Sequence, residues 1–222
     1  SDLEVVRLAY SSPITPLTLL EVELAFGTRH IVQQRHVPNF DSSLYQTEQL
    51  MLPVRDGAEV PVSIVYRADR FEPGLNPLYL YAYGSYGVST DPEFLAHRIS
   101  LLDRGFVIAI AHVRGGKELG FAWYENGRLL NKKNTFNDFI DVTQALTAAG
   151  YGDREQVIAS GGSAGGMLMA VVANEAPELY RGIVARAPFV DVLTTMLDDS
   201  LPLTASDLLE WGDPRQKEFY DY

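Results

Sequence analysis

The chain has 222 residues, of which 46% are hydrophobic and 21% charged, a composition typical of a folded globular protein and not of a disordered one. Its formal net charge of −11 argues against nucleic acids and anionic membranes as partners, and it is compatible with a cationic substrate. The absence of cysteine excludes disulfides, thiolate metal sites and a cysteine nucleophile. No apolar run approaches the roughly 18 residues of a membrane-spanning helix, and we expect a cytoplasmic protein.

Residues 1–44 are predicted to form only β-structure. The predicted strands are 6–10, 17–24 and 31–32. Pro13 and Pro16 lie in the first connection, and Gly27 lies in the second. Because three short strands cannot bury a hydrophobic core alone, we expect this segment to pack against another part of the protein.

Residues 45–222 alternate apolar strands with helices. The predicted strands are 49–54, 60–66, 78–84, 106–111, 157–160 and 182–187, and the predicted helices are 94–102, 135–149 and 167–174. Asp56-Gly57 predicts a hairpin between the first two strands. Thr135 and Asp138 have the spacing of a capping box for a helix that Gly150 closes. This alternation predicts an α/β fold, with a mostly parallel sheet and helices on both faces.

Ser163 lies in a G-x-S-x-G pattern that follows a predicted strand and opens a predicted helix. Strand, sharp turn and helix together are the context of a nucleophile elbow. The small residues from Gly161 to Gly166 leave room for a strained backbone that projects the serine hydroxyl. Free N–H groups at a helix N-terminus favour an oxyanion, so we expect Ser163 as nucleophile and the Ala164 N–H as an oxyanion donor. The alternative is a glycine-rich helix start that only packs closely against the sheet.

The general base that a serine nucleophile requires is harder to find. In α/β-hydrolases the acid and the histidine follow the serine, but the four histidines of this chain all precede Ser163. His112 follows a predicted buried strand, and we expect it to be a hydrogen-bonded polar residue at a strand end and not the base. The base therefore comes either from another chain or from a longer enzyme of which this chain is a part, and we expect the acid and the base to lie in sequence beyond this chain.

Tyr83 ends the first buried parallel strand, where side chains line the active sites of such sheets. Its hydroxyl could donate a hydrogen bond to developing negative charge. Aromatic residues also favour strands for packing reasons, so both interpretations of Tyr83 stay open at this point.

Five sequence blocks carry a family resemblance. They are Tyr83-Gly84-Ser85-Tyr86-Gly87, Val113-Arg114-Gly115-Gly116 with Glu118-Leu119-Gly120, Asn134-Thr135-Phe136-Asn137-Asp138-Phe139, Gly161-Gly162-Ser163-Ala164-Gly165-Gly166, and residues 188–198. On these blocks the chain resembles the prolyl oligopeptidase family of serine peptidases, most closely its oligopeptidase B group. The resemblance implies an α/β-hydrolase domain capped by a β-propeller that screens out large proteins. It also implies that 1–44 end the last propeller blade and that 45–222 are the N-terminal part of an α/β-hydrolase domain, incomplete at its C-terminal end.

The resemblance implies roles for five residues of the site. Ser163 matches the nucleophile of the family, and Tyr83 matches the tyrosine that supplies the side-chain half of the oxyanion hole. The Ala164 N–H supplies the other half. Tyr86 and Phe189 fall where the family places walls of the primary specificity pocket.

The oligopeptidase B group cleaves after Lys or Arg, using acidic residues that follow the block at 188–198. Asp207 falls at one acidic position of that pocket, whereas Leu209 falls where a second acid is expected. The loss of one acid should weaken selectivity for basic residues without abolishing it. The alternative is that Asp207 and Glu210 belong to a solvated helix face.

These observations predict a serine endopeptidase that cuts short basic peptides after Arg or Lys through an acyl-enzyme on Ser163. Neither a metal-ligand spacing nor a nucleotide-binding motif is present, and we expect no cofactor. Expected partners are the peptide substrate and the remaining C-terminal part of the same protein. Two alternatives stay open: another α/β-hydrolase activity, such as an esterase or an aminopeptidase, and an inactive chain that lacks the acid and the histidine.

Overall fold

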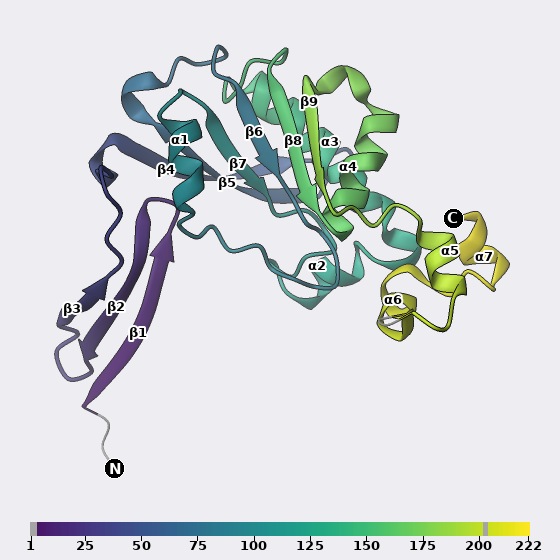
Figure 1. The fold of residues 1–222 in the computed structure, drawn as a ribbon, viewed down its shortest axis with the longest axis horizontal. Coiled ribbons are helices and arrows are strands. Elements are labelled where there is room, and N and C mark those ends of the chain that lie inside the picture. Colours follow the sequence, from purple (N-terminus) through teal and green to yellow (C-terminus); the bar gives the residue numbers. More distant parts are fainter. Residues whose placement is uncertain (1–3, 202–203) are drawn as a thin grey trace.

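The computed structural model describes residues 4–201 and 204–222, which form two separate sheets (Figure 1). The first sheet is antiparallel and contains β1 (Val5–Ser12), β2 (Thr15–Glu23) and β3 (Arg29–Gln34) in that order. This sheet projects away from the rest of the molecule, and every residue of β3 is exposed. The three strands predicted for this region are therefore confirmed.

The second sheet has six strands in the order β4-β5-β7-β6-β8-β9. The strands are β4 (Tyr45–Pro53), β5 (Glu59–Arg67), β6 (Leu78–Tyr81), β7 (Val107–Ala111), β8 (Val157–Gly162) and β9 (Gly182–Arg186). The β4–β5 hairpin forms around Asp56-Gly57 as predicted, and β5 pairs antiparallel with β7. The pairs β7–β6, β6–β8 and β8–β9 are parallel.

Helices cover both faces of this sheet. On one face, apolar side chains of α3 (Lys133–Ala148) and α4 (Ala164–Glu175) pack against the strands, with Phe139 and Met169 fully buried. On the opposite face, Leu102 of α1 (Ala96–Leu102) packs on Ile108. The consecutive β7 residues Ile108 and Ala109 belong to different clusters because successive strand residues point to opposite faces.

The remaining helices lie near the carboxyl ends of the parallel strands (Figure 1). They are α2 (Phe121–Glu125), α5 (Val192–Leu197), α6 (Thr204–Trp211) and α7 (Lys217–Asp221). Ligands of open α/β sheets bind at this edge, so these helices are placed to shape a site. Within the described residues, no helix combines the length and the apolar character that crossing a bilayer requires.

The predicted capping box at Thr135 and Asp138 is wrong. Helix α3 begins at Lys133, so both residues lie inside it, and both are fully buried. The Thr135 hydroxyl donates to the carbonyl of Arg114 at 2.7 Å, and the Asp138 carboxylate accepts hydrogen bonds from Nη2 and Nε of Arg114 at 2.6 and 2.9 Å. The two side chains therefore anchor the loop after β7 to α3. Gly150 closes the helix in a left-handed conformation (φ 85°), as predicted.

Candidate active site

Ser163 occupies the sharp turn between β8 and α4. Its backbone has φ 53° and ψ −118°, a combination that a residue with a side chain rarely adopts, and its side chain is exposed. The turn is fixed from both sides: the Ser163 N–H donates to the carbonyl of Arg186 at 2.9 Å, and its carbonyl accepts from the N–H of Phe189 at 2.9 Å. This strained and exposed serine has the geometry predicted for a nucleophile elbow.

Two glycines of the elbow have no room for a side chain. A Cβ atom on Gly161 would lie 2.2 Å from the carbonyl oxygen of Gly165. A Cβ atom on Gly165 would lie 2.8 Å from the carbonyl oxygen of Ala82, at the end of the neighbouring strand. The glycines therefore allow α4 to start directly against β6, which brings Tyr83 to the serine.

Tyr83 and Ala164 present two hydrogen-bond donors beside Ser163. Burial raises the pKa of the Tyr83 hydroxyl, and a hydrogen bond with the Ser163 side chain opposes that shift. The phenol is therefore protonated at neutral pH, which a donor to an oxyanion requires. Ala164 is the first residue of α4, so its N–H has no acceptor within the helix.

Three aromatic side chains form a wall next to the elbow. The rings of Tyr86 and Trp211 meet edge to face with centroids 6.0 Å apart, and the rings of Phe189 and Trp211 lie 5.9 Å apart. The Trp211 indole N–H donates to the Tyr86 hydroxyl at 3.0 Å. Tyr86 also has a left-handed backbone (φ 58°), which is unusual for an aromatic residue and places a second strained position in this site.

Asp207 of α6 faces this aromatic wall. Its Oδ1 accepts a hydrogen bond of 2.8 Å from the Tyr86 hydroxyl, and its side chain is half-buried. Burial raises the pKa of Tyr86 and the bond to Asp207 adds to the increase, so the phenol stays protonated as the donor. Leu209 points into solvent with 65% exposure and does not join the wall.

Glu210 does not belong to a solvated helix face, so that alternative is wrong for this residue. Its side chain is completely buried, and its Oε1 lies 3.1 Å from the Lys132 Nζ. The Lys132 ammonium also lies 4.8 Å from the centroid of the Trp211 ring. The buried Lys132–Glu210 ion pair thus packs against Trp211 of the aromatic wall.

None of the four histidines, all within the described part of the chain, forms a hydrogen bond with Ser163. The buried His112 has its Nε2 2.8 Å from Ser63 Oγ of β5, and its Nδ1 lies 3.5 Å from Glu118 Oε1. The position of His112 at a strand end matches the structural role expected for it. Among the described residues, no histidine is therefore placed to act as a general base for Ser163.

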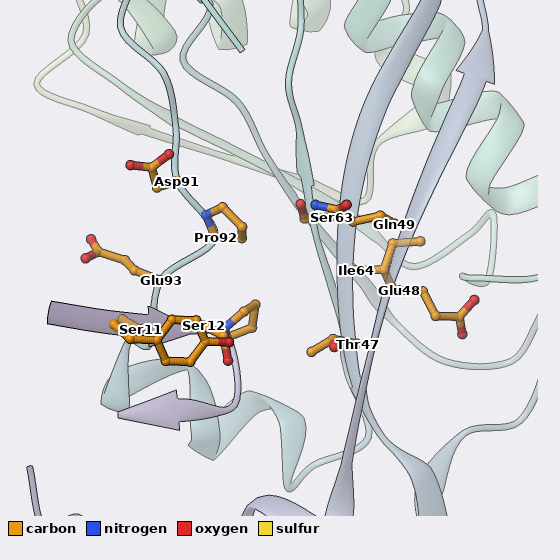
Figure 2. Close-up of a pocket in the computed structure, with 12 residues that line it drawn as sticks. Ser11, Ser12, Thr47, Glu48, Gln49, Ser63, Ile64, Asp91, Pro92 and Glu93 are labelled. Carbon is orange, nitrogen blue, oxygen red and sulfur yellow. The ribbon is translucent and has the colours of Figure 1, made fainter. Parts of the chain in front are cut away.

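A cavity of about 750 Å³ lies away from Ser163, between the first sheet and the six-stranded sheet. Figure 2 shows it bordered by the β1–β2 turn, by β4 and by the segment 91–93. It contains none of the residues predicted for the active site. Among the described residues, no group of three or more His, Asp, Glu or Cys side chains is arranged to hold a metal ion.

Sequence reasoning missed two residues that complete the site. Trp211 is the centre of the aromatic wall, and Lys132 supports it through Glu210. A signal was present for each: Trp211 is adjacent to Glu210 on the helix that carries Asp207, and Lys132 lies two positions before the Asn134–Phe139 block. Neither signal indicates by itself that the two residues meet.

Known proteins resemble this chain along its whole length. Dipeptidyl aminopeptidase BI from Pseudoxanthomonas mexicana is 51% identical over 218 residues, which are 98% of this chain and 30% of that protein. Protease 2 from Moraxella lacunata is 45% identical over 222 residues, which are 100% of this chain and 32% of that protein. The chain therefore spans about a third of the length of these relatives.

A solved structure shares the fold. Oligopeptidase B from Leishmania major superposes with a TM-score of 0.93 and 43% identity, covering 100% of this chain and 31% of that one. The predicted fold class is thereby confirmed, since the chain has an α/β-hydrolase fold preceded by strands of a propeller blade. The model of the prolyl oligopeptidase family matches residues 92–222, which include Ser163 and α6. Together with the elbow at Ser163, these similarities show that the chain belongs to the prolyl oligopeptidase family.

Proposed function

We propose that the protein containing this chain is an oligopeptidase B-like serine endopeptidase that hydrolyses short peptides after Arg or Lys. The observation that carries this proposal is the strained, exposed Ser163 at the start of α4, with the Tyr83 hydroxyl and the Ala164 N–H beside it. A serine held in this way exposes its hydroxyl for attack and has two hydrogen-bond donors beside it for the negative charge that develops.

The reaction begins when Ser163 Oγ attacks the carbonyl carbon of the scissile peptide bond. A base from another part of the protein takes the hydroxyl proton, and the carbonyl oxygen becomes an oxyanion. The Tyr83 hydroxyl and the Ala164 N–H donate hydrogen bonds to that oxyanion. The intermediate collapses, the leaving amine departs with the proton, and water then hydrolyses the acyl-enzyme and frees Ser163.

Selectivity for basic side chains is assigned to Asp207 and the aromatic wall. A carboxylate gives a guanidinium or an ammonium a charge-assisted hydrogen bond, and aromatic faces attract the same cations. Asp207 is the acid on α6 that faces Tyr86, since Glu210 is paired with Lys132 and Leu209 is apolar. One carboxylate predicts a preference for basic residues that is weaker than two would give.

A dipeptidyl aminopeptidase is a second candidate. The relative with 51% identity is named as one, so the same scaffold is compatible with removal of dipeptides from a free N-terminus. The two candidates share Ser163 chemistry and differ in whether the substrate must carry a free α-amino group two residues before the cleaved bond.

Three chromogenic substrates separate these functions when the longest natural protein containing this chain is assayed. The first is a peptide amide with Arg before the cleaved bond and a blocked N-terminus. The second is a dipeptide amide with Arg before the cleaved bond and a free N-terminal amino group. The third is the blocked peptide amide with Leu in place of Arg. Cleavage of the blocked Arg substrate over the Leu substrate supports the endopeptidase, whereas cleavage of only the free dipeptide supports the aminopeptidase. In Ser163→Ala every activity should fall by about 10⁵-fold or more. Ser163→Ala that retains activity would exclude both candidates.

A further inference from the structure

Two segments of the candidate site are far apart in sequence, and both contact one buried side chain. The loop 83–87 carries Tyr83 and Tyr86, and α6 carries Asp207 and Trp211. Lys132, which lies directly before α3, reaches both segments and is only 4% exposed. A buried cation therefore lies between the two segments of the candidate site.

All three N–H donors of the Lys132 ammonium can be assigned an acceptor. Nζ donates to the Gly84 carbonyl at 2.6 Å and to Ser85 Oγ at 2.6 Å, and it donates to Glu210 Oε1 at 3.1 Å. An ammonium group has three donors, so these contacts fix the geometry of all of them. Gly84 and Ser85 lie between the two tyrosines of the loop, and Glu210 lies between Asp207 and Trp211 on α6.

Stability alone does not explain this arrangement. Removing two charges from water costs several kcal/mol per ion, and an apolar pair of similar volume often gives equal or greater stability. Burial lowers the pKa of Lys132 to about 8, and Glu210 opposes this shift. The buried environment therefore disfavours the charged form of Lys132. The pair therefore secures a geometry at an energetic cost.

We propose that Lys132 is a positioning residue that holds the oxyanion tyrosine and the specificity pocket in register. Through Gly84 and Ser85 it sets the position of Tyr83 relative to Ser163. Through Glu210 it sets the position of α6, and with it Asp207. This inference rests on the proposed peptidase function, because it concerns the two halves of that site.

The adjacent Lys133 provides a matched control. It carries the same charge one position along the chain, but it is exposed and its ammonium lies 4.7 Å from the centroid of the Tyr222 ring. These contacts of Lys133 are with Tyr222, and they involve neither the loop 83–87 nor Glu210. Lys132→Met and Lys133→Met therefore remove the same charge with different consequences for the site.

The test compares steady-state kinetics of the longest natural protein and its variants on two substrates. The first is a neutral aryl ester, which depends on Ser163 and Tyr83, and the second is the blocked Arg peptide amide, which also depends on α6. Because small displacements of catalytic groups are costly, Lys132→Met should lower kcat on the ester by about 10-fold or more with KM within about twofold. It should also raise KM for the Arg substrate by about 10-fold. Lys132→Arg should restore part of both losses, and Lys133→Met should match the wild type.

Glu210→Gln keeps the shape of its side chain and serves as a second variant if Lys132→Met does not fold. It should raise KM for the Arg substrate several-fold. Unchanged parameters in a folded Lys132→Met, or in Glu210→Gln where Lys132→Met does not fold, would overturn the positioning role while the proposed function stands. A wild-type protein that cleaves neither substrate would instead contradict the proposed function, and the positioning role would fail with it.

Discussion

The elbow around Ser163 and the aromatic wall with Asp207 are two halves of the candidate site, and they arise in different ways. The elbow is contiguous in sequence, since β8, the turn and α4 occupy residues 157–175. The aromatic wall and the Asp207 that faces it bring together Tyr86, Phe189, Asp207 and Trp211 from three separate segments. The elbow therefore depends on local backbone geometry, whereas the wall depends on long-range contacts. Changes to the two halves should have separable effects on rate and on selectivity.

The largest effect is expected from a side chain added to the elbow. In Gly161→Ala the new Cβ atom would lie 2.2 Å from the Gly165 carbonyl oxygen, so the turn must open. We expect a loss of about 4 kcal/mol or more in stability and the loss of activity. Gly162→Ala is the matched control, because its nearest atom would lie at 3.6 Å, and it should cost under about 1 kcal/mol. Thermal melting of both variants measures the difference, and equal melting temperatures would contradict the crowded elbow.

The next effect concerns the rate alone. Tyr83→Phe removes the hydroxyl beside Ser163 and keeps the ring. We expect kcat to fall by about 10²- to 10³-fold on the ester and on the Arg substrate alike, with KM nearly unchanged. Steady-state kinetics on both substrates checks this. A fall in kcat of less than about threefold would show that Tyr83 does not donate to the oxyanion.

The buried pair behind the wall predicts a pH dependence of stability. The pKa of Lys132 is about 8 in the folded protein, against an ordinary value of 10.5. Between these values the unfolded chain holds a proton that the folded protein has released, so unfolding takes up a proton and stability rises with pH. Relative to Lys132→Met, the wild type should gain up to about 1.4 kcal/mol per pH unit over this range. Melting temperatures from pH 7 to 10.5 check the sign, and a gap between the two proteins that does not change with pH would refute it.

The smallest effect is expected at the wall and concerns selectivity. Asp207→Asn keeps an acceptor for the Tyr86 hydroxyl but removes the charge. We expect KM for the Arg substrate to rise by about 10- to 100-fold, while the neutral ester is hydrolysed at its normal rate. If the Asp207→Asn variant still prefers the Arg substrate over the Leu substrate, selectivity for basic side chains does not depend on α6.

The same division explains which features the sequence reveals. The strands, the hairpin at Asp56-Gly57 and the elbow at Ser163 follow from local patterns, because each depends on residue types within a few positions of one another. The start of α3 could not be predicted from local patterns. Thr135 and Asp138 have the spacing of a capping box, but tertiary contacts with Arg114 occupy both side chains.

The aromatic wall and its buried ion pair could not be predicted from the sequence, because they depend on contacts between distant residues. Lys132 and Glu210 are 78 positions apart, and no local periodicity indicates that their side chains meet. A charged residue on a short helix is usually solvated, so the complete burial of Glu210 becomes visible only when the chain is folded. Trp211 likewise gains its role from Tyr86 and Phe189, which the fold brings to it.

Labelling with a fluorophosphonate, followed by mapping of the adduct by peptide mass spectrometry, tests the nucleophile most directly. The experiment uses the longest natural protein containing this chain, with Ser163→Ala as the control. The account predicts one stoichiometric adduct on Ser163, formed in parallel with the loss of peptidase activity and absent from the control. An adduct on another serine, or a folded and active protein that stays unlabelled at Ser163, would contradict it.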